Sequence, residues 1–215
     1  MNKTLLTFLL LIVINANLKA QDPHRFEEEI KIINELPATK GKDLTVFTGS
    51  SSIRLWKNLT RDCHGMQVIN TGFGGSHMSD LLYFIEQTVL RFQPTTVYIY
   101  EGDNDIAELK EPKAILETAK QVTNKILESN PNTKIYFISA KPSPSRWAFK
   151  EKYVAFNSLL KEYCDSNRQL FYTDVWGAML DKKGLVAPHI FISDSLHMNR
   201  QGYLLWKDII CNGSE

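Results

Sequence analysis

The chain has 215 residues, of which 43% are hydrophobic and 23% are charged, and its formal net charge is +1. This balance leaves no excess of basic residues for binding nucleic acid or an anionic membrane surface. The sequence contains no internal repeat, low-complexity tract or long linker. We therefore expect residues 21–215 to form a single domain with a full hydrophobic core.

Residues 1–20 have the pattern of a secretory signal peptide. Lys3 precedes an apolar run over 5–14 that one threonine interrupts, and the segment ends at the small residue Ala20. The run is shorter than a membrane span, and no second long apolar stretch follows it. Cleavage would remove Lys3 and Lys19 and change the net charge from +1 to −1. We expect a secreted or periplasmic protein without stable membrane insertion, and an uncleaved N-terminal anchor is the alternative.

After this segment the sequence alternates between helical and strand-like patterns. The helices are indicated by apolar residues at helical spacing, and the strands by short apolar, β-branched and aromatic runs. In chain order, we predict a helix over 24–36, strands over 44–48 and 67–70, a helix over 78–92, a strand over 95–100, a helix over 112–129, a strand over 133–139, a helix over 148–166, a strand over 169–173 and a last helix over 199–211.

Five strands separated by helices indicate parallel βαβ units with right-handed crossovers. The expected fold class is α/β, a three-layer α/β/α sandwich with a central five-stranded parallel sheet. In such sheets, functional sites lie beyond the carboxyl ends of the strands. Three segments, 49–52, 72–75 and 102–105, each follow a predicted strand at that end. They are therefore expected to meet at one edge of the sheet.

Ser50, Ser51 and Ser52 follow Gly49 at a predicted strand-to-helix turn. A serine run after glycine is more often a loop or a helix cap than a catalytic site. The position favours catalysis, because such a turn exposes a side chain while helix amides point toward it. The Gly-x-Ser-x-Gly elbow of the common α/β-hydrolases is absent, since position 53 is isoleucine.

Asp194 and His197 lie three residues apart near the C-terminus. A tight loop can bring such a carboxylate to one ring nitrogen, which leaves the other nitrogen free to accept a serine proton. The alternative is that Asp194 caps the last helix. His189 and His77 are rival bases, but His189 has no acid at comparable spacing and His77 is expected at a helix start.

Gly75 and Asn104 are the candidate oxyanion donors. Glycine after a strand and asparagine in a Gly-Asp-Asn-Asp stretch are often only turn residues. Beside a nucleophile, however, the Gly75 amide and the Asn104 side chain can both donate hydrogen bonds to an oxyanion, and each such donor is typically worth about 3 kcal/mol.

The four motifs together resemble those of the SGNH or GDSL hydrolases. Gly-Ser-Ser at 49–51, Gly-Phe-Gly-Gly at 72–75, Gly-Asp-Asn-Asp at 102–105 and Asp-Ser-Leu-His at 194–197 occur in the family's order. The resemblance implies a flavodoxin-like SGNH hydrolase fold and a serine esterase that needs no metal and no cofactor. It also implies the site residues: Ser51 as nucleophile and amide donor, His197 as base, Asp194 as the orienting acid, and Gly75 and Asn104 as the other oxyanion donors.

The family usually has aspartate immediately before the nucleophile, where this chain has Ser50. That aspartate is not the acid of the triad, so the implied triad is complete. The spacing from Gly49 favours Ser51 as the attacking serine, and Ser50 and Ser52 remain the alternatives.

The family includes carbohydrate deacetylases, lysophospholipases, thioesterases and general carboxylesterases. Short loops leave little room for a lid or an acyl tunnel, which favours short acyl groups and acetyl above all. The expected substrate is an ester of a carbohydrate or another small molecule. Arg146 and Trp147 are candidate substrate-binding residues, because they can stack on a sugar or pair with a phosphate. The alternative is a solvated arginine and a packed tryptophan.

Two functions of other classes remain possible. One is a catalytically silent binding module on the same scaffold. The other is a flavodoxin-like nucleotide binder, but the chain has neither Gly-x-x-x-x-Gly-Lys-Ser/Thr nor Gly-x-Gly-x-x-Gly.

The cysteines are Cys63, Cys164 and Cys211. The sequence contains no Cys-x-x-Cys motif and no His/Cys cluster, so it gives no indication of a zinc site. At most one disulfide can form, the sequence does not say which, and buried free thiols are the alternative.

Overall fold

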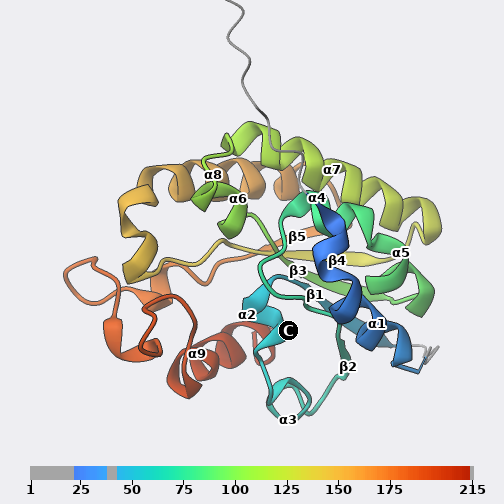
Figure 1. Ribbon diagram of the computed structural model, residues 1–215, viewed down its shortest axis with the longest axis horizontal. Coiled ribbons are helices and arrows are strands. Elements are labelled where there is room, and N and C mark those ends of the chain that lie inside the picture. The colour runs from blue at the N-terminus through green and yellow to red at the C-terminus, as the bar shows by residue number, and fades with distance from the viewer. Residues whose placement is uncertain (1–21, 38–42, 214–215) are drawn as a thin grey trace, which may run out of the picture.

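Five parallel strands form the centre of the fold (Figure 1). The computed structural model describes residues 22–37 and 43–213, and the predicted signal peptide lies outside the described residues. The strand order is β2-β1-β3-β4-β5, and every pair is parallel. The strands are β1 (Leu44–Gly49), β2 (Gln67–Asn70), β3 (Thr96–Tyr100), β4 (Lys134–Ile138) and β5 (Leu170–Thr173).

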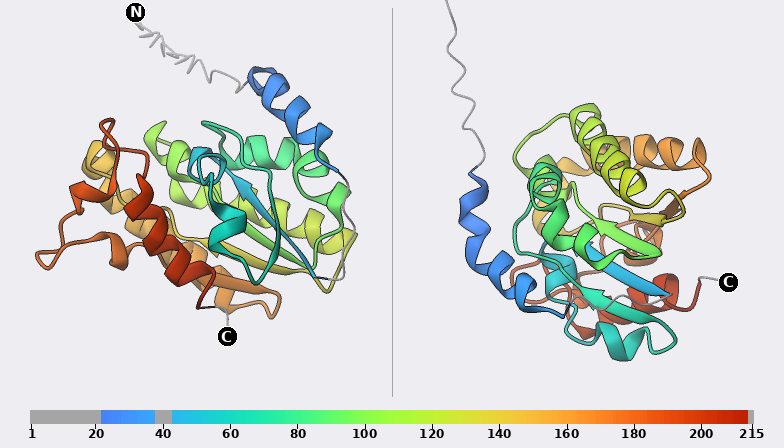
Figure 2. Two further views of the ribbon diagram at one scale, coloured as in Figure 1. Left: turned by 90° about the horizontal axis from the view of Figure 1, so that it is seen from below. Right: turned by 90° about the vertical axis from the view of Figure 1, so that its right-hand side faces the viewer.

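Helices cover both faces of this sheet, which Figure 2 shows as three layers. One face packs against α1 (Glu27–Glu35), α4 (Met78–Tyr83), α5 (Ile85–Thr88), α7 (Pro112–Ser129) and α8 (Lys150–Asp165). The other packs against α2 (Ser51–Arg54), α3 (Leu59–Asp62) and α9 (Arg200–Ile210). The short helix α6 (Asp103–Ala107) follows the carboxyl end of β3. The predicted three-layer sandwich with a five-stranded parallel sheet is therefore confirmed.

Alternation along the strands explains why two separate cores form. Val46 and Val97 belong to one core cluster, and their neighbours Phe47 and Tyr98 belong to the other. Phe47 and Tyr98 are register partners, and their rings stack with centroids 4.6 Å apart. Because successive side chains point to opposite faces of a strand, each buried strand supplies both layers.

The predicted helix over 78–92 is interrupted in the structure. It consists of α4, α5 and a 3₁₀ turn over Leu90–Phe92. Phe84 separates the two helices with φ −98° and ψ 19°, and Val89 ends the second with φ −133°. Thr88 donates its hydroxyl to the Phe84 carbonyl at 2.9 Å. Side-chain bonds of this kind and the stiffness of adjacent β-branched residues favour a break.

A disulfide joins Cys63, which follows α3, to Cys211, which follows α9. Their Cα atoms lie 5.1 Å apart although 148 residues separate them in the sequence. Cys164 is a buried free thiol in α8. The disulfide therefore ties the segment after α3 to the C-terminal helix on one face of the sheet.

None of the helices within the described ranges is long and apolar enough to cross a membrane.

Candidate active site

The turn between β1 and α2 places its three serines differently. Gly49 has φ +124°, and a Cβ atom there would lie 2.0 Å from the Tyr100 carbonyl oxygen, so only glycine fits. Ser50 donates its amide to that same oxygen at 3.0 Å. Ser50 and Ser52 are buried, whereas Ser51 is partly exposed at the first position of α2. The turn thus presents Ser51 and hides its neighbours.

Ser51, His197 and Asp194 form a hydrogen-bonded chain. The Ser51 Oγ lies 2.9 Å from His197 Nε2, and His197 Nδ1 lies 2.6 Å from Asp194 Oδ2. The other carboxylate oxygen of Asp194 accepts the amides of Leu196 and His197, each at 2.9 Å. Desolvation opposes ionisation of Asp194, but the His197 ring and these amides outweigh it and lower its pKa to about 2. Ionised Asp194 favours the proton on Nδ1, which leaves Nε2 to accept the Ser51 hydroxyl.

The segment after β4 holds the loop that carries Asp194 and His197. Ser195, between them, has φ +57°, a left-handed conformation that is uncommon outside glycine. Its carbonyl accepts the Ser145 amide at 3.1 Å. Lys141, which is only 1% exposed, donates from Nζ to the Leu196 carbonyl at 2.8 Å. Burial lowers the pKa of Lys141 to about 8, although the charge of Asp103 works in the opposite direction.

Replacing Lys141 with methionine should change how the free energy of unfolding depends on pH. The pKa of Lys141 falls from an ordinary 10.5 to about 8 in the folded protein, so the unfolded chain binds more protons between these values. The wild-type protein should therefore gain stability relative to Lys141→Met as the pH rises from 8 to 10.5, by about 3 kcal/mol in total. Urea unfolding of both proteins at about pH 7, 9 and 10.5 measures this gain. A difference in stability that stays constant with pH would contradict it.

The segments after β1, β2 and β3 are hydrogen-bonded to one another. Phe73, in the loop after β2, donates its amide to the Gly49 carbonyl at 2.9 Å. Asn104, in α6 after β3, donates from Nδ2 to the Ser76 carbonyl at 2.8 Å. The predicted convergence of the segments 49–52, 72–75 and 102–105 at the carboxyl edge of the sheet therefore occurs.

Three N–H donors at this edge are candidates for holding an oxyanion. Gly75 adopts φ +76°, and within the described residues neither its amide nor that of Ser51 donates to a protein acceptor. The Ser51 amide is in the first turn of a helix, where amides have no intrahelical acceptor. Asn104 Nδ2 carries two protons, of which Ser76 takes one. The second proton of Asn104 is left for a ligand.

The buried acid Glu101 lies next to the segment 72–75, which we call the glycine loop. Ser76 Oγ is 3.0 Å from the Phe73 carbonyl oxygen and 2.5 Å from Glu101 Oε1. Burial, reinforced by the negative charges of Asp105 and Asp103, raises the pKa of Glu101 well above its usual range. The surroundings of Glu101 therefore favour its neutral form more strongly than water does.

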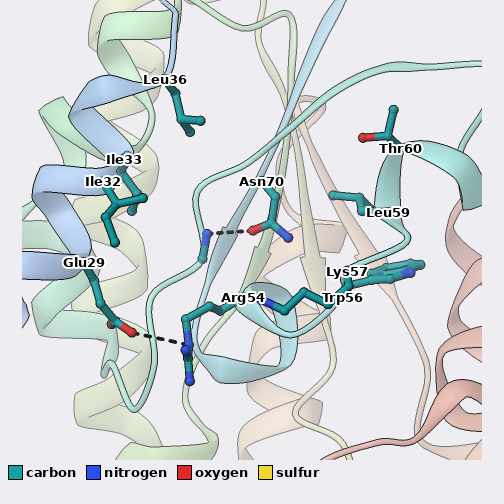
Figure 3. Close-up of a pocket in the computed structure, with 11 residues that line it drawn as sticks. Glu29, Ile32, Ile33, Leu36, Arg54, Trp56, Lys57, Leu59, Thr60 and Asn70 are labelled. Carbon is teal, nitrogen blue, oxygen red and sulfur yellow. Dashed lines mark hydrogen bonds and ion pairs between the residues drawn. The ribbon is translucent and has the colours of Figure 1, made fainter.

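Glu29 of α1 supports the glycine loop from its outer side. One of its carboxylate oxygens accepts the Gly74 amide at 2.7 Å, and the other lies 3.4 Å from Arg54 Nε (Figure 3). Glu29 and Arg54 also border a cavity of about 400 Å³ that α1 and the segment after α2 line with both apolar and polar side chains. A second cavity, of about 410 Å³, is lined by Glu29, Gly74 and Gly75 together with Arg25 and Phe26. The second cavity provides space directly beside a predicted oxyanion donor.

The rival histidines have other surroundings. His77 is the buried N-cap of α4, as expected for a helix start, and its Nδ1 lies 3.1 Å from Asp80 and 2.9 Å from Arg25. His189 is exposed in a 3₁₀ turn over Pro188–Ile190. Among the described histidines, only His197 contacts Ser51.

Arg146 and Trp147 lie in a 3₁₀ turn over Pro144–Phe149 after β4. The Arg146 side chain is 16% exposed and donates from Nη2 to Asn104 Oδ1 at 2.8 Å. Trp147 stacks on Trp176 with ring centroids 6.1 Å apart. The structure shows these contacts within the protein, and a substrate contact for either residue stays a prediction.

Sequence reasoning missed Lys141 and Glu101. Each is a charged residue type within three residues of the end of a buried strand, Glu101 directly after β3 and Lys141 shortly after β4. Their position just after a strand could have marked them as functional candidates, because charged residues are rarely buried without a specific partner.

Among residues 22–37 and 43–213, no group of three or more His, Cys, Asp or Glu side chains is arranged to hold a metal ion.

Solved structures with this fold include three that are similar over most of the chain. A candidate acylhydrolase from Bacteroides fragilis is 21% identical, with a TM-score of 0.75 over 90% of this chain and 97% of that one. A GDSL-like lipase from Bacteroides thetaiotaomicron is 19% identical, with a TM-score of 0.73 over 89% and 96%. A mutant acetyl-xylooligosaccharide esterase from Geobacillus Stearmophilus is 14% identical, with a TM-score of 0.66 over 82% and 95%. At these identities the similarity shows the fold.

Among curated proteins no sequence matches this chain. The profile of the GDSL-like lipase/acylhydrolase family matches residues 39–205, which contain every predicted site residue from Ser51 to His197. The match spans well over half of the sequence and agrees with the fold and with the order of the four motifs. The chain belongs to the GDSL-like lipase/acylhydrolase family.

Proposed function

We propose that this protein is a secreted serine esterase that hydrolyses short acyl esters, acetyl esters first, of carbohydrates or similar small molecules. The observation that supports this best is the chain of contacts from Ser51 Oγ through His197 to Asp194, with distances of 2.9 and 2.6 Å. The family assignment supports ester hydrolysis independently.

Acylation begins when Ser51 Oγ attacks the ester carbonyl carbon and His197 Nε2 takes the hydroxyl proton. The Ser51 and Gly75 amides and the second Asn104 Nδ2 proton hold the negative oxygen of the tetrahedral intermediate. Asp194 stabilises the imidazolium and keeps the ring oriented. His197 then gives its proton to the leaving alcohol as the carbon–oxygen bond breaks, which leaves an acyl group on Ser51.

Deacylation repeats these steps with water. His197 takes a proton from a water molecule that attacks the acyl carbonyl, and the same three donors hold the second tetrahedral intermediate. Collapse of this intermediate returns the proton to Ser51 Oγ and releases the carboxylic acid.

Asn104→Ala should lower kcat by roughly 10²–10³-fold, as the loss of other single oxyanion donors does, while KM changes little. Asn104→Asp should be at least as damaging, because a carboxylate repels the developing negative charge. Steady-state kinetics on a short-chain nitrophenyl ester measure both parameters. An Asn104→Ala variant with wild-type kcat would remove Asn104 from the oxyanion site.

The acyl preference is tested with a series of substrates. We expect kcat/KM to be highest for acetylated sugars and nitrophenyl acetate and to fall at least tenfold for octanoyl esters. A lysophospholipid or an acyl thioester that is hydrolysed faster than the acetyl esters would instead favour the lysophospholipase or thioesterase alternative.

Secretion is proposed from two observations. The sequence begins with the pattern of a signal peptide, and Cys63 and Cys211 form a disulfide, a bond that persists in oxidising compartments. Expression of the full chain in a secreting host, followed by N-terminal sequencing, should give a mature protein that begins near residue 21. A product that keeps residues 1–20 in the membrane fraction would favour the anchored alternative.

A further inference from the structure

We infer that Arg146 is a positioning residue that orients the Asn104 side-chain amide toward the oxyanion. This inference rests on the proposed function, because it assigns a partner to one of the proposed oxyanion donors. It also differs from a direct role of Arg146 in binding substrate, and the two roles predict different kinetics.

The Asn104 amide is held from both ends. Its Oδ1 accepts Arg146 Nη2 at 2.8 Å, and its Nδ2 donates to the Ser76 carbonyl at 2.8 Å. These two bonds fix the rotation of the amide about its last side-chain torsion, which is otherwise broad and nearly two-fold. The remaining Nδ2 proton therefore has one direction instead of several.

Arg146 is itself fixed and mostly buried. Its Nη1 lies 3.2 Å from Asp103 Oδ2, and its side chain is only 16% exposed. Asp103 is anchored in turn, because the Tyr100 hydroxyl donates to the same carboxylate oxygen at 3.0 Å. A planar guanidinium can bridge the side chains of two adjacent residues in this way, whereas an ammonium is a point charge.

The Arg146 bond also strengthens the donor. A hydrogen bond from a cation to Oδ1 draws electron density from the amide nitrogen, and hydrogen bonds in such a series reinforce one another. The Asn104 N–H that faces the oxyanion is thereby a better donor than an amide solvated by water. Arg146 thus contributes to catalysis through Asn104 and without touching the reacting atoms.

A double-mutant cycle tests this coupling with nitrophenyl acetate as the substrate. Arg146→Met should lower kcat about tenfold and leave KM within about twofold of the wild-type value, and Arg146→Lys should show a smaller loss of the same kind. The double variant Asn104→Ala/Arg146→Met should be no slower than Asn104→Ala alone, because Arg146 has nothing left to position. Lys150→Met, which removes a cation at the start of α8 that has no hydrogen bond to Asn104, should keep the wild-type kcat.

Several results would overturn the inference. A raised KM with unchanged kcat would make Arg146 a substrate-binding residue, and multiplicative losses in the double variant would separate it from Asn104. If Arg146→Met does not fold, as judged by circular dichroism, the same cycle with Arg146→Lys decides between these outcomes.

A second readout does not depend on esterase activity. The ¹⁵N NMR signals of the Asn104 side-chain amide, assigned by their loss in Asn104→Ala, should shift or broaden in Arg146→Lys. Unchanged signals would contradict the inference. If instead the wild-type protein hydrolyses no ester while these signals respond to Arg146→Lys, the proposed function fails and the positioning contact stands.

Discussion

Ser51→Ala is expected to lower the turnover of a nitrophenyl ester by 10⁴-fold or more without unfolding the protein. In the proposed mechanism Ser51 supplies the attacking oxygen, and removing a member of such a triad leaves only the rate enhancement due to binding and the oxyanion donors. Its side chain is small and partly exposed, so the free energy of unfolding should change little. End-point assays at high enzyme concentration measure the turnover, and a thermal melt detects any change in stability.

Ser50→Ala is the matched control. Ser50 is buried in the same turn, and its hydroxyl has no hydrogen-bond partner in the described part of the chain. Removing that hydroxyl should therefore keep most of the activity. An inactive Ser50→Ala variant together with an active Ser51→Ala variant would reverse the assignment of the nucleophile.

His197→Ala should cause a loss similar to that of Ser51→Ala, because no other described histidine contacts Ser51. In the proposed mechanism only the neutral His197 ring can accept the serine proton. Asp194 adds no transition near neutral pH to the profile of kcat/KM, because its pKa is lowered to about 2. Steady-state kinetics of His197→Ala and of the wild-type protein on a nitrophenyl ester measure the loss.

The lowered pKa of Asp194 also determines the pH range in which the folded protein loses stability. A carboxyl whose pKa is lowered on folding stabilises the protein at pH values above its ordinary pKa of 3.8, and it loses this contribution as the pH falls toward 2.

His189→Ala, at an exposed site, is the matched control for His197→Ala and should behave like the wild-type protein. A fully active His197→Ala variant would exclude His197 as the base.

The fold and the approximate location of the site were predictable because each depends on short-range patterns. Gly49, Gly72 and Gly102 each stand within two residues of a strand's end, and parallel strands bring their carboxyl ends to one edge. The three-residue spacing of Asp194 and His197 is likewise local, and the structure closes it into a hydrogen bond of 2.6 Å.

Features that depend on tertiary packing were not predictable in this way. The break at Phe84 leaves the apolar spacing of the predicted helix intact, so the pattern does not reveal it. The pairing of Cys63 with Cys211 and the bond from Arg146 to Asn104 join residues 148 and 42 positions apart. Such contacts follow from how the layers pack, and one sequence carries no direct signal for them.

The measurement that tests the central proposal most directly is labelling with a serine-directed fluorophosphonate, followed by peptide mass spectrometry. We expect one adduct per chain on Ser51, no labelling of Ser51→Ala, and much slower labelling of His197→Ala because its serine is not activated. Complete resistance of the folded wild-type protein, or an adduct on another serine that persists in Ser51→Ala, would contradict the proposal that Ser51 is the nucleophile of an esterase.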